Sequence, residues 1–100
     1  MPKTIHRPEY SLLRELVREE RVRAGVTQAD LSARLNRSQS FVSDVERGVR
    51  RLDVIELRDM CQVLGSNFLE VVAEFEKRTR RDLGGLAPSR RAGKVAAKGR

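Results

Sequence analysis

Residues 26–48 read VTQADLSARLNRSQSFVSDVERG, and this stretch decides the fold of the chain. It contains two short runs, residues 27–35 and residues 38–47, in which apolar side chains recur at helical spacing. Asn36 stands between the runs and tolerates the left-handed backbone conformation that a tight turn needs. Gly48 is a typical helix stop after the second run. The stretch is therefore predicted to be two helices joined by a tight turn.

Capping signals support both helices. Thr27 precedes Asp30 by three residues, a spacing that resembles a capping box, and opens the first helix. Ser38 is a good N-cap for a second helix that runs from Gln39 to about Arg47. The predicted inward residues are Leu31 and Leu35 in the first helix, and Val42 and Val45 in the second.

Three more helices are predicted around this pair. One covers about residues 9–24 and is stopped by a glycine, and two begin where Asp53 and Asn67 each precede a glutamate by three residues. Their apolar faces are expected to consist of Leu13, Leu16, Val17 and Ala24 in the first, Val54, Leu57, Cys61 and Leu64 in the next, and Phe68, Leu69, Val71, Val72 and Phe75 in the last. Since no segment shows a strand pattern, the predicted fold class is all-α with five helices.

The charge is distributed unevenly along the chain. The 100 residues suit one domain, and the net charge of +7 indicates a polyanionic partner, with nucleic acid ahead of an anionic membrane surface. Residues 77–100 hold nine basic groups and one acid, against twelve and thirteen in residues 1–76. We therefore predict a flexible basic arm at 1–8, a folded domain at 9–78, and a basic, disordered tail at 79–100.

Composition excludes several classes of function. Cys61 is the single cysteine and His6 the single histidine, so no disulfide and no metal site are expected. Cys61 is predicted to be an inert core thiol. The chain has no glycine-rich phosphate loop and no nucleophile with a base at recognisable spacing, so neither an enzyme nor a cofactor is predicted. Without a signal-peptide core or a membrane span, the chain is expected to be soluble and cytoplasmic.

The ordered combination of residues in the central stretch resembles the Cro and cI phage-repressor class of DNA-binding domains, the XRE-like helix-turn-helix regulators. The resemblance covers about residues 13–72 and implies a five-helix, lambda-repressor-like fold that binds double-stranded DNA. The residues that carry it are Gly25, Thr27, Gln28, Leu31, Leu35, Ser40, Val42, Ser43, Val45, Glu46, Arg47 and Gly48.

The resemblance implies that the third helix lies in the DNA major groove. Gln39 is the best base reader, because its amide can both donate to and accept from adenine. Asp44 departs from the family pattern, and would either impose a cytosine preference or repel the phosphates. Phe41 could touch a thymine methyl, although packing against its neighbours is the favoured interpretation. The implied base-reading residues are Gln39, Ser40, Ser43 and Asp44.

Other residues would position the protein on DNA without reading bases. Gln28 opens the second helix, where its side chain and the free backbone N–H groups can hold a phosphate oxygen. Arg21 and Glu46 match a family ion pair that ties the first helix to the end of the third. The implied phosphate-contacting residues are Gln28, Arg37, Arg47, Arg50 and Arg51.

The last helix has more apolar surface than a small core requires. Its residues Phe68, Leu69, Val71, Val72 and Phe75 are therefore predicted to form a dimer interface, the alternative being that the tail folds back over them. The leading hypothesis is a homodimeric repressor or autoregulator on a near-palindromic operator. The alternatives are a toxin-binding antitoxin, a restriction-modification controller protein, or an adaptor that keeps the fold but binds protein.

Overall fold

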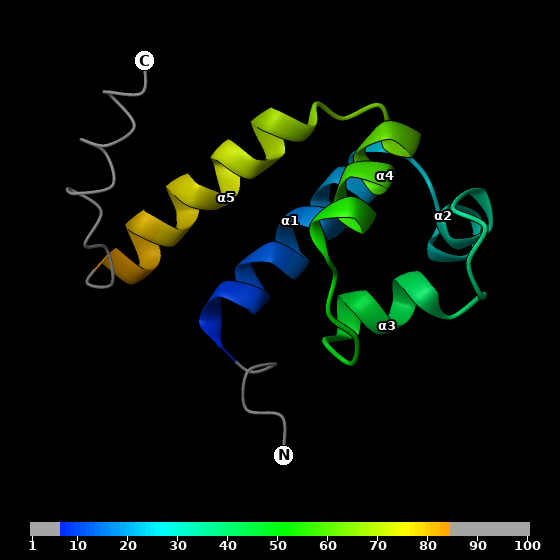
Figure 1. Ribbon diagram of the computed structural model, residues 1–100, viewed down its shortest axis with the longest axis horizontal. Helices are drawn as coiled ribbons and strands as arrows, with labels where there is room; N and C mark the ends of the chain where they lie inside the picture. The colour runs from blue at the N-terminus through cyan, green and yellow to red at the C-terminus, as the bar shows by residue number, and fades with distance from the viewer. Residues whose placement is uncertain (1–6, 85–100) are drawn as a thin grey trace.

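The structure, a computed structural model, describes residues 7–84, and the regular secondary structure in that range is entirely helical. The predicted all-α class is confirmed, whereas most of the predicted basic arm and tail lie outside the described residues. The five helices, shown in Figure 1, are α1 (Pro8–Ala24), α2 (Gln28–Arg34), α3 (Phe41–Arg47), α4 (Val54–Leu64) and α5 (Phe68–Leu83).

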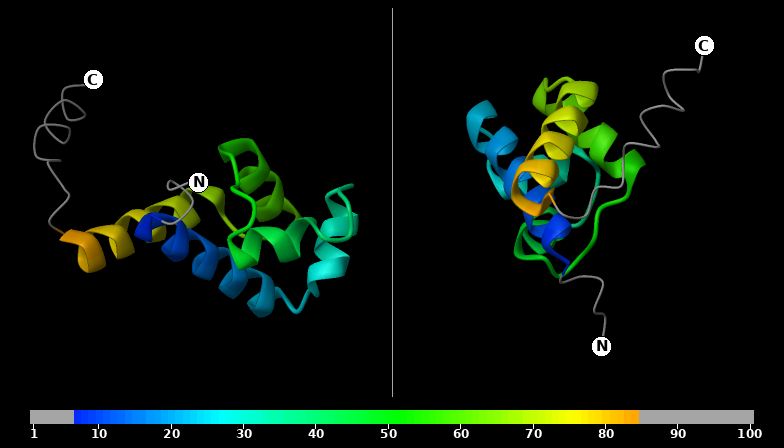
Figure 2. Two further views of the ribbon diagram at one scale, coloured as in Figure 1. Left: turned by 90° about the horizontal axis from the view of Figure 1, so that it is seen from below. Right: turned by 90° about the vertical axis from the view of Figure 1, so that its left-hand side faces the viewer.

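Helix α1 is the centre of the arrangement, since it contacts α3, α4 and α5, while α2 packs on α3 and α4. Figure 2 shows α2 and α3 at one end of the molecule and the C-terminal end of α5 at the other. Along α3, Arg47 is exposed, and Ser43 and Asp44 are half-buried. None of the helices in residues 7–84 is long and apolar enough to cross a membrane.

The core lies between α1 and the other four helices. One of its residues was not predicted from the sequence. Met60 is almost fully buried, so α4 turns Leu57, Met60 and Cys61 inward. Val54, which was expected on that face, is exposed because it stands at the first residue of α4, and Leu52 from the preceding loop packs against the core instead. Ala24, expected on the inward face of α1, is also exposed.

Most of the predicted helix starts are confirmed. The side chain of Thr27 accepts a hydrogen bond from the Asp30 N–H at 3.0 Å. Asn67 caps α5 in the same way, and α4 has a complete capping box in which Asp53 and Glu56 each accept from the other's backbone. Asn36 adopts the expected left-handed conformation with φ 63°, so the turn after α2 forms as predicted.

The predicted N-cap at Ser38 is wrong. The Phe41 N–H donates to the Ser38 carbonyl at 3.0 Å, so Ser38 begins a turn and α3 starts at Phe41. The amide of Val42, in the first turn of α3, donates instead to the buried hydroxyl of Ser32 at 3.1 Å. A side chain of α2 thus satisfies the start of α3, which joins the two helices at their turn.

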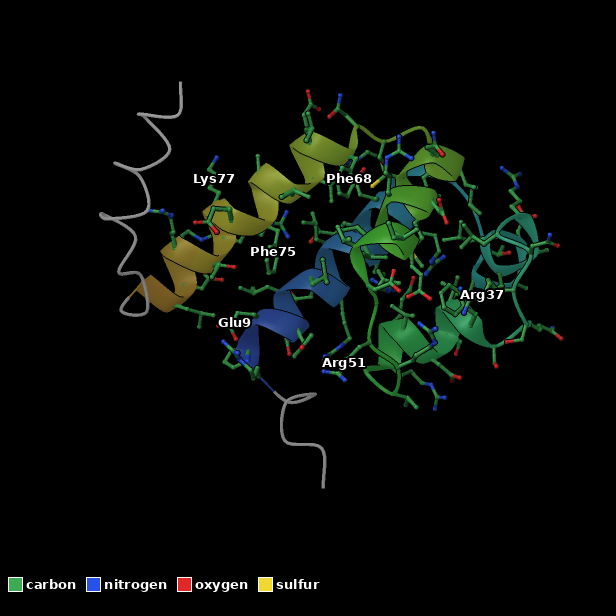
Figure 3. The ribbon with its side chains drawn as sticks, in the orientation of Figure 1. Glu9, Arg37, Arg51, Phe68, Phe75 and Lys77 are labelled. Carbon is green, nitrogen blue, oxygen red and sulfur yellow. The ribbon has the colours of Figure 1, made fainter. Side chains whose placement is uncertain are left out.

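Helix α5 extends beyond the boundary expected at residue 78 and ends at Leu83. Arg78 fastens it to α1, since its guanidinium donates to Glu19 on α1 at 2.9 Å and to Glu74 one turn earlier at 2.8 Å. In Figure 3, Phe75 points from α5 toward α1, and Lys77 points to the opposite side of the helix. Residues 79–83 therefore continue α5, where the sequence predicted the start of a disordered tail.

Candidate nucleic-acid interface

The residues predicted to read bases gather at the start of α3. Gln39 and Ser40 are exposed in the turn before the helix, and Ser43 and Asp44 are half-buried in the helix itself. The Asp44 N–H donates to the Ser40 carbonyl at 2.8 Å, so the turn leads directly into the helical path. Because residues four apart share a helix face, the four side chains form one polar surface.

Asp44 has a cationic partner on this surface. Arg47 Nη2 donates to Asp44 Oδ1 at 2.6 Å, and the two residues lie three apart on α3. Arg47, which was predicted to contact a phosphate, therefore offsets the charge of Asp44 in the free protein. Arg47 is 63% exposed and Asp44 29%, so solvent weakens the pair and both side chains can exchange partners.

Beneath this surface, Arg21 of α1 and Glu46 of α3 form a bidentate ion pair. Arg21 Nε donates to Glu46 Oε2 at 2.7 Å, and its Nη2 donates to Oε1 at 3.0 Å. The third nitrogen of the guanidinium donates to the Val26 carbonyl at 2.8 Å. The side chains of Arg21 and Glu46 are nearly buried, at 11% and 4% exposed. The pair therefore fixes α3 against α1, and its hydrogen bonds satisfy the two buried charges.

Gln28 also contacts this ion pair. Its Nε2 donates to Glu46 Oε1 at 2.8 Å, which orients the amide at the N-terminal end of α2. The side chain is half-buried and was predicted to hold a phosphate oxygen. The structure thus places Gln28 between the buried pair and the outer surface.

Phe41 packs into the core, as favoured on sequence grounds, and its ring carries two guanidinium groups. The Cζ atom of Arg37 lies 4.1 Å from the ring centroid, and that of Arg50 lies 4.7 Å from it. Both distances are within the range of a cation–π interaction. One arginine comes from the turn before α3 and the other from the loop after it, so the ring brings together two cations that are distant in sequence.

The carboxylate of Glu56 on α4 binds the same two arginines. Its Oε1 accepts from Arg50 Nη1 and its Oε2 from Arg50 Nη2, at 3.0 and 2.9 Å. Arg37 Nη1 also donates to Oε2, at 3.0 Å. The hydrogen bonds from Arg50, together with those from the Asp53 backbone and Arg37, lower the pKa of Glu56 to about 2. Sequence reasoning identified Glu56 only as a capping residue, and its spacing shows no sign of the arginine contacts.

The predicted phosphate-contacting arginines lie at both ends of α3. Figure 3 shows Arg37 near one end of the helix and Arg51 near the other. Arg51 is exposed in the loop between α3 and α4, next to Arg50. The polar surface of α3 therefore has positive charge on both sides.

The residues predicted to form a dimer interface separate into two groups. Val71 is buried in the core of the single chain, and Phe68 and Phe75 pack partly against that core. Leu69 and Val72 stay exposed, at 74% and 37%.

Two further exposed apolar residues lie at the start of α4, and sequence reasoning did not place them on the surface. Val54 and Ile55 are 62% and 63% exposed. Val54 and Val72 line one shallow groove of about 180 Å³, with Leu13, Leu52 and Phe75 among the other residues of its walls. Val54 of α4 and Val72 of α5 therefore meet at one groove.

Cys61 is a free, buried thiol, and burial, with a contribution from the nearby Glu20, raises its pKa. This agrees with the predicted core role. Within residues 7–84, His, Cys, Asp and Glu side chains form no group of three that could hold a metal ion. His6 lies outside the described residues.

Comparison with known proteins identifies the family. A family profile described as helix-turn-helix domain matches residues 12–75, more than half of the chain. Over 53 residues the chain is 40% identical to the uncharacterized HTH-type transcriptional regulator y4dJ of Sinorhizobium fredii, covering 53% of this chain and 69% of that protein.

Solved structures agree with this assignment. An XRE-family like protein from Pseudomonas syringae pv. tomato is 47% identical, with a TM-score of 0.69, covering 77% of this chain and 94% of that one. The clp gene regulator ClgR of Corynebacterium glutamicum, at 24% identity, shares the fold with a TM-score of 0.63 and coverages of 80% and 90%. The family consists of transcriptional regulators and not of enzymes. The chain belongs to the helix-turn-helix transcriptional regulators of the XRE family.

Proposed function

We propose that the chain is a sequence-specific regulator that binds double-stranded DNA as a homodimer and inserts α3 into the major groove. The observation that carries this proposal is the partly exposed polar surface at the start of α3, with arginines at both of its ends and a buried ion pair behind it. Such a surface offers base readers on a rigid support and cations for the two phosphate backbones. A dimer bound over an operator excludes other proteins from that DNA, so repression or autoregulation is the proposed outcome.

Gln39 is the proposed principal base reader. Its exposed amide can pair with the N6 and N7 atoms of adenine, whereas the hydroxyls of Ser40 and Ser43 adapt to either donors or acceptors. The Arg47 contact offsets the charge of Asp44, so we propose that Asp44 is tolerated near the phosphates and accepts from a cytosine amino group where the operator presents one.

The proposed phosphate contacts come from three places around α3. Arg37 precedes the helix, and Arg50 and Arg51 follow it. Gln28 lies at the N-terminal end of α2, where backbone N–H groups without helical partners favour an anion. These contacts fix the orientation of the protein on the duplex.

A second copy is the proposed occupant of the exposed apolar surface on α4 and α5. One reading helix makes few base contacts, so two-fold binding to an inverted repeat supplies the affinity that a single domain lacks. Val54 of α4 and Val72 of α5 line one apolar groove, and Ile55 and Leu69 are exposed on the same two helices, which is the kind of surface that a partner covers. In this proposal Val71 stays within each single chain.

Selection of bound duplexes from a random DNA pool tests the proposed function. The winner is then titrated at two salt concentrations, and the protein's mass is measured in sedimentation with and without that DNA. We expect an enriched inverted repeat that binds two chains. Uniform, salt-sensitive binding without an enriched motif would contradict sequence-specific reading. One chain per selected duplex would contradict the homodimer.

A further inference from the structure

We propose that Glu56 is a positioning residue for DNA binding, because it holds Arg37 and Arg50 together against Phe41 as one preoriented pair of cations. The inference deepens the proposed function and rests on it. Glu56 lies on α4, outside the helix-turn-helix pair, yet the two arginines that it holds come from both sides of α3.

The orientation of the carboxylate is set before any DNA arrives. Glu56 Oε1 accepts from the Asp53 N–H at 3.0 Å, and the Glu56 N–H donates to Asp53 Oδ1 at 2.7 Å. These two bonds form the capping box of α4, so the backbone of a core helix fixes the acid. The Phe41 ring, buried at the start of α3, supplies the second wall of the site. Both arginines are thus held between two fixed groups.

The arrangement leaves donors for a phosphate. A guanidinium has five N–H donors, and Arg37 uses one of them on Glu56 among the described residues. Arg50 uses three, two on Glu56 and one on the Arg51 carbonyl. Two guanidinium groups around one carboxylate keep a net positive charge. The pair can therefore bind a phosphate oxygen while Glu56 still holds both side chains.

Charge and orientation make opposite predictions for the removal of this acid. By charge alone, replacing Glu56 with a neutral residue would strengthen binding to every DNA, since one anion near the phosphates is lost. If Glu56 orients the arginines, their side chains become mobile when it is removed. Binding to the operator must then fix them in one geometry, and this costs conformational entropy in the specific complex. The ratio of operator affinity to random-duplex affinity then falls.

The test compares Glu56→Gln with the matched control Glu70→Gln. Gln also suits the third position of a capping box, so the start of α4 is preserved. Glu70 occupies the same helical position in α5, and no arginine among residues 7–84 donates to it. Affinities for the selected operator and for a random duplex are measured at one salt concentration. We expect the ratio to fall about three- to tenfold in Glu56→Gln and to stay unchanged in Glu70→Gln.

Two further measurements keep the inference falsifiable. In a background with Arg37→Ala and Arg50→Ala, Glu56→Gln should leave the ratio unchanged, because the groups that it orients are gone. In the free protein, NMR signals of the Arg50 Nε–H should indicate a fixed side chain that becomes mobile in Glu56→Gln.

The outcomes separate this inference from the proposed function. If the wild-type chain does not discriminate between operator and random duplex, the proposed function fails and the positioning role fails with it. If the wild type discriminates and Glu56→Gln keeps the same ratio, or if the Arg50 signals do not change, the positioning role alone fails. A loss of unfolding free energy without a change in the ratio would reduce Glu56 to a structural residue.

Discussion

Glu46 lies on α3 and Glu56 on α4, and each accepts two hydrogen bonds from one arginine. Glu46 is 4% exposed and its partner Arg21 is 11% exposed. Glu56 is 15% exposed, and its partners Arg37 and Arg50 are each 37% exposed. The chemistry of the two clusters is nearly the same, but their depth differs.

That difference in depth assigns different roles to the clusters. A buried ion pair cannot exchange its partners for water, so each partner depends on the other, and the pair fixes the angle of α3. Half-exposed arginines can keep their hydrogen bonds to a carboxylate and also bind an incoming phosphate, because both arginine side chains remain accessible. Burial therefore decides whether such a cluster acts mainly on stability or mainly on binding.

The largest expected effect is on the buried cluster. Glu46→Ala leaves Arg21 without its counter-charge in a nearly dry site, so we expect a loss of about 3 to 5 kcal/mol in the free energy of unfolding. Denaturant unfolding measures it. The matched control is Glu76→Ala, which removes an exposed pair with Arg80 and should cost no more than about 0.5 kcal/mol. Similar losses in the two variants would contradict the claim that burial decides how much an ion pair contributes to stability.

Acid titration tests the cluster formed by Glu56, Arg37 and Arg50. The pKa of Glu56 is lowered from 4.5 to about 2 in the folded chain, so its contribution is fully present above about pH 4.5 and is lost as the pH falls toward 2. The shift sets an upper limit of about 3 kcal/mol, and the loss should be well below it, because solvent screens arginines that are 37% exposed. Unfolding free energies at several pH values should fall less steeply in Glu56→Gln than in the wild type. Equal slopes would show that the arginines do not hold this acid.

Gln39→Ala should separate binding from stability. The side chain is exposed, so the unfolding free energy should stay within about 0.5 kcal/mol of the wild type, while operator discrimination falls by about 1 to 3 kcal/mol. Gln62→Ala, at an exposed position of α4, is the control and should change neither quantity. A domain that binds protein and not DNA would be indifferent to Gln39→Ala.

A small effect on stability is also expected at Asp44. Asp44→Asn removes the exposed pair with Arg47, so stability should change by no more than about 0.5 kcal/mol. Affinity for DNA in general should rise, because one anion is lost and Arg47 becomes available to the phosphates. Filter binding to operator and random duplexes measures both affinities. Only at operators that present a cytosine to Asp44 should the affinity fall, because the proposed contact with the cytosine amino group is lost; a uniform rise at every duplex would contradict that contact.

Local signals predicted the helical elements well where the stabilising groups are close in sequence. Asn36 in its turn and the capping pair of Asp53 and Glu56 need no distant residue, so their sequence pattern suffices. The start of α3 was misplaced because its amide is satisfied by Ser32, from the preceding helix. Sequence signals for helix capping involve residues within one turn of the helix start, and Ser32 is ten residues before Val42.

The candidate site shows the same limit more strongly. The resemblance supplied the pair Arg21 and Glu46, but the grouping of Arg37, Phe41, Arg50 and Glu56 arises only when the α3–α4 loop folds back. The dimer interface stays a prediction, although one of its five residues, Val71, is buried within the single chain because α5 packs on α1 and α4. Amphipathic periodicity shows that a face is apolar, but it does not show which neighbour covers it.

Backbone amide NMR signals recorded during titration with the selected operator test the central claim most directly. We expect the largest changes at Gln28, at residues 37–47 and at Arg50 and Arg51, with small changes along the middle of α1. Changes concentrated instead on α5 and the C-terminal end of α1, with the α3 signals unmoved, would contradict the claim that this chain reads DNA with α3.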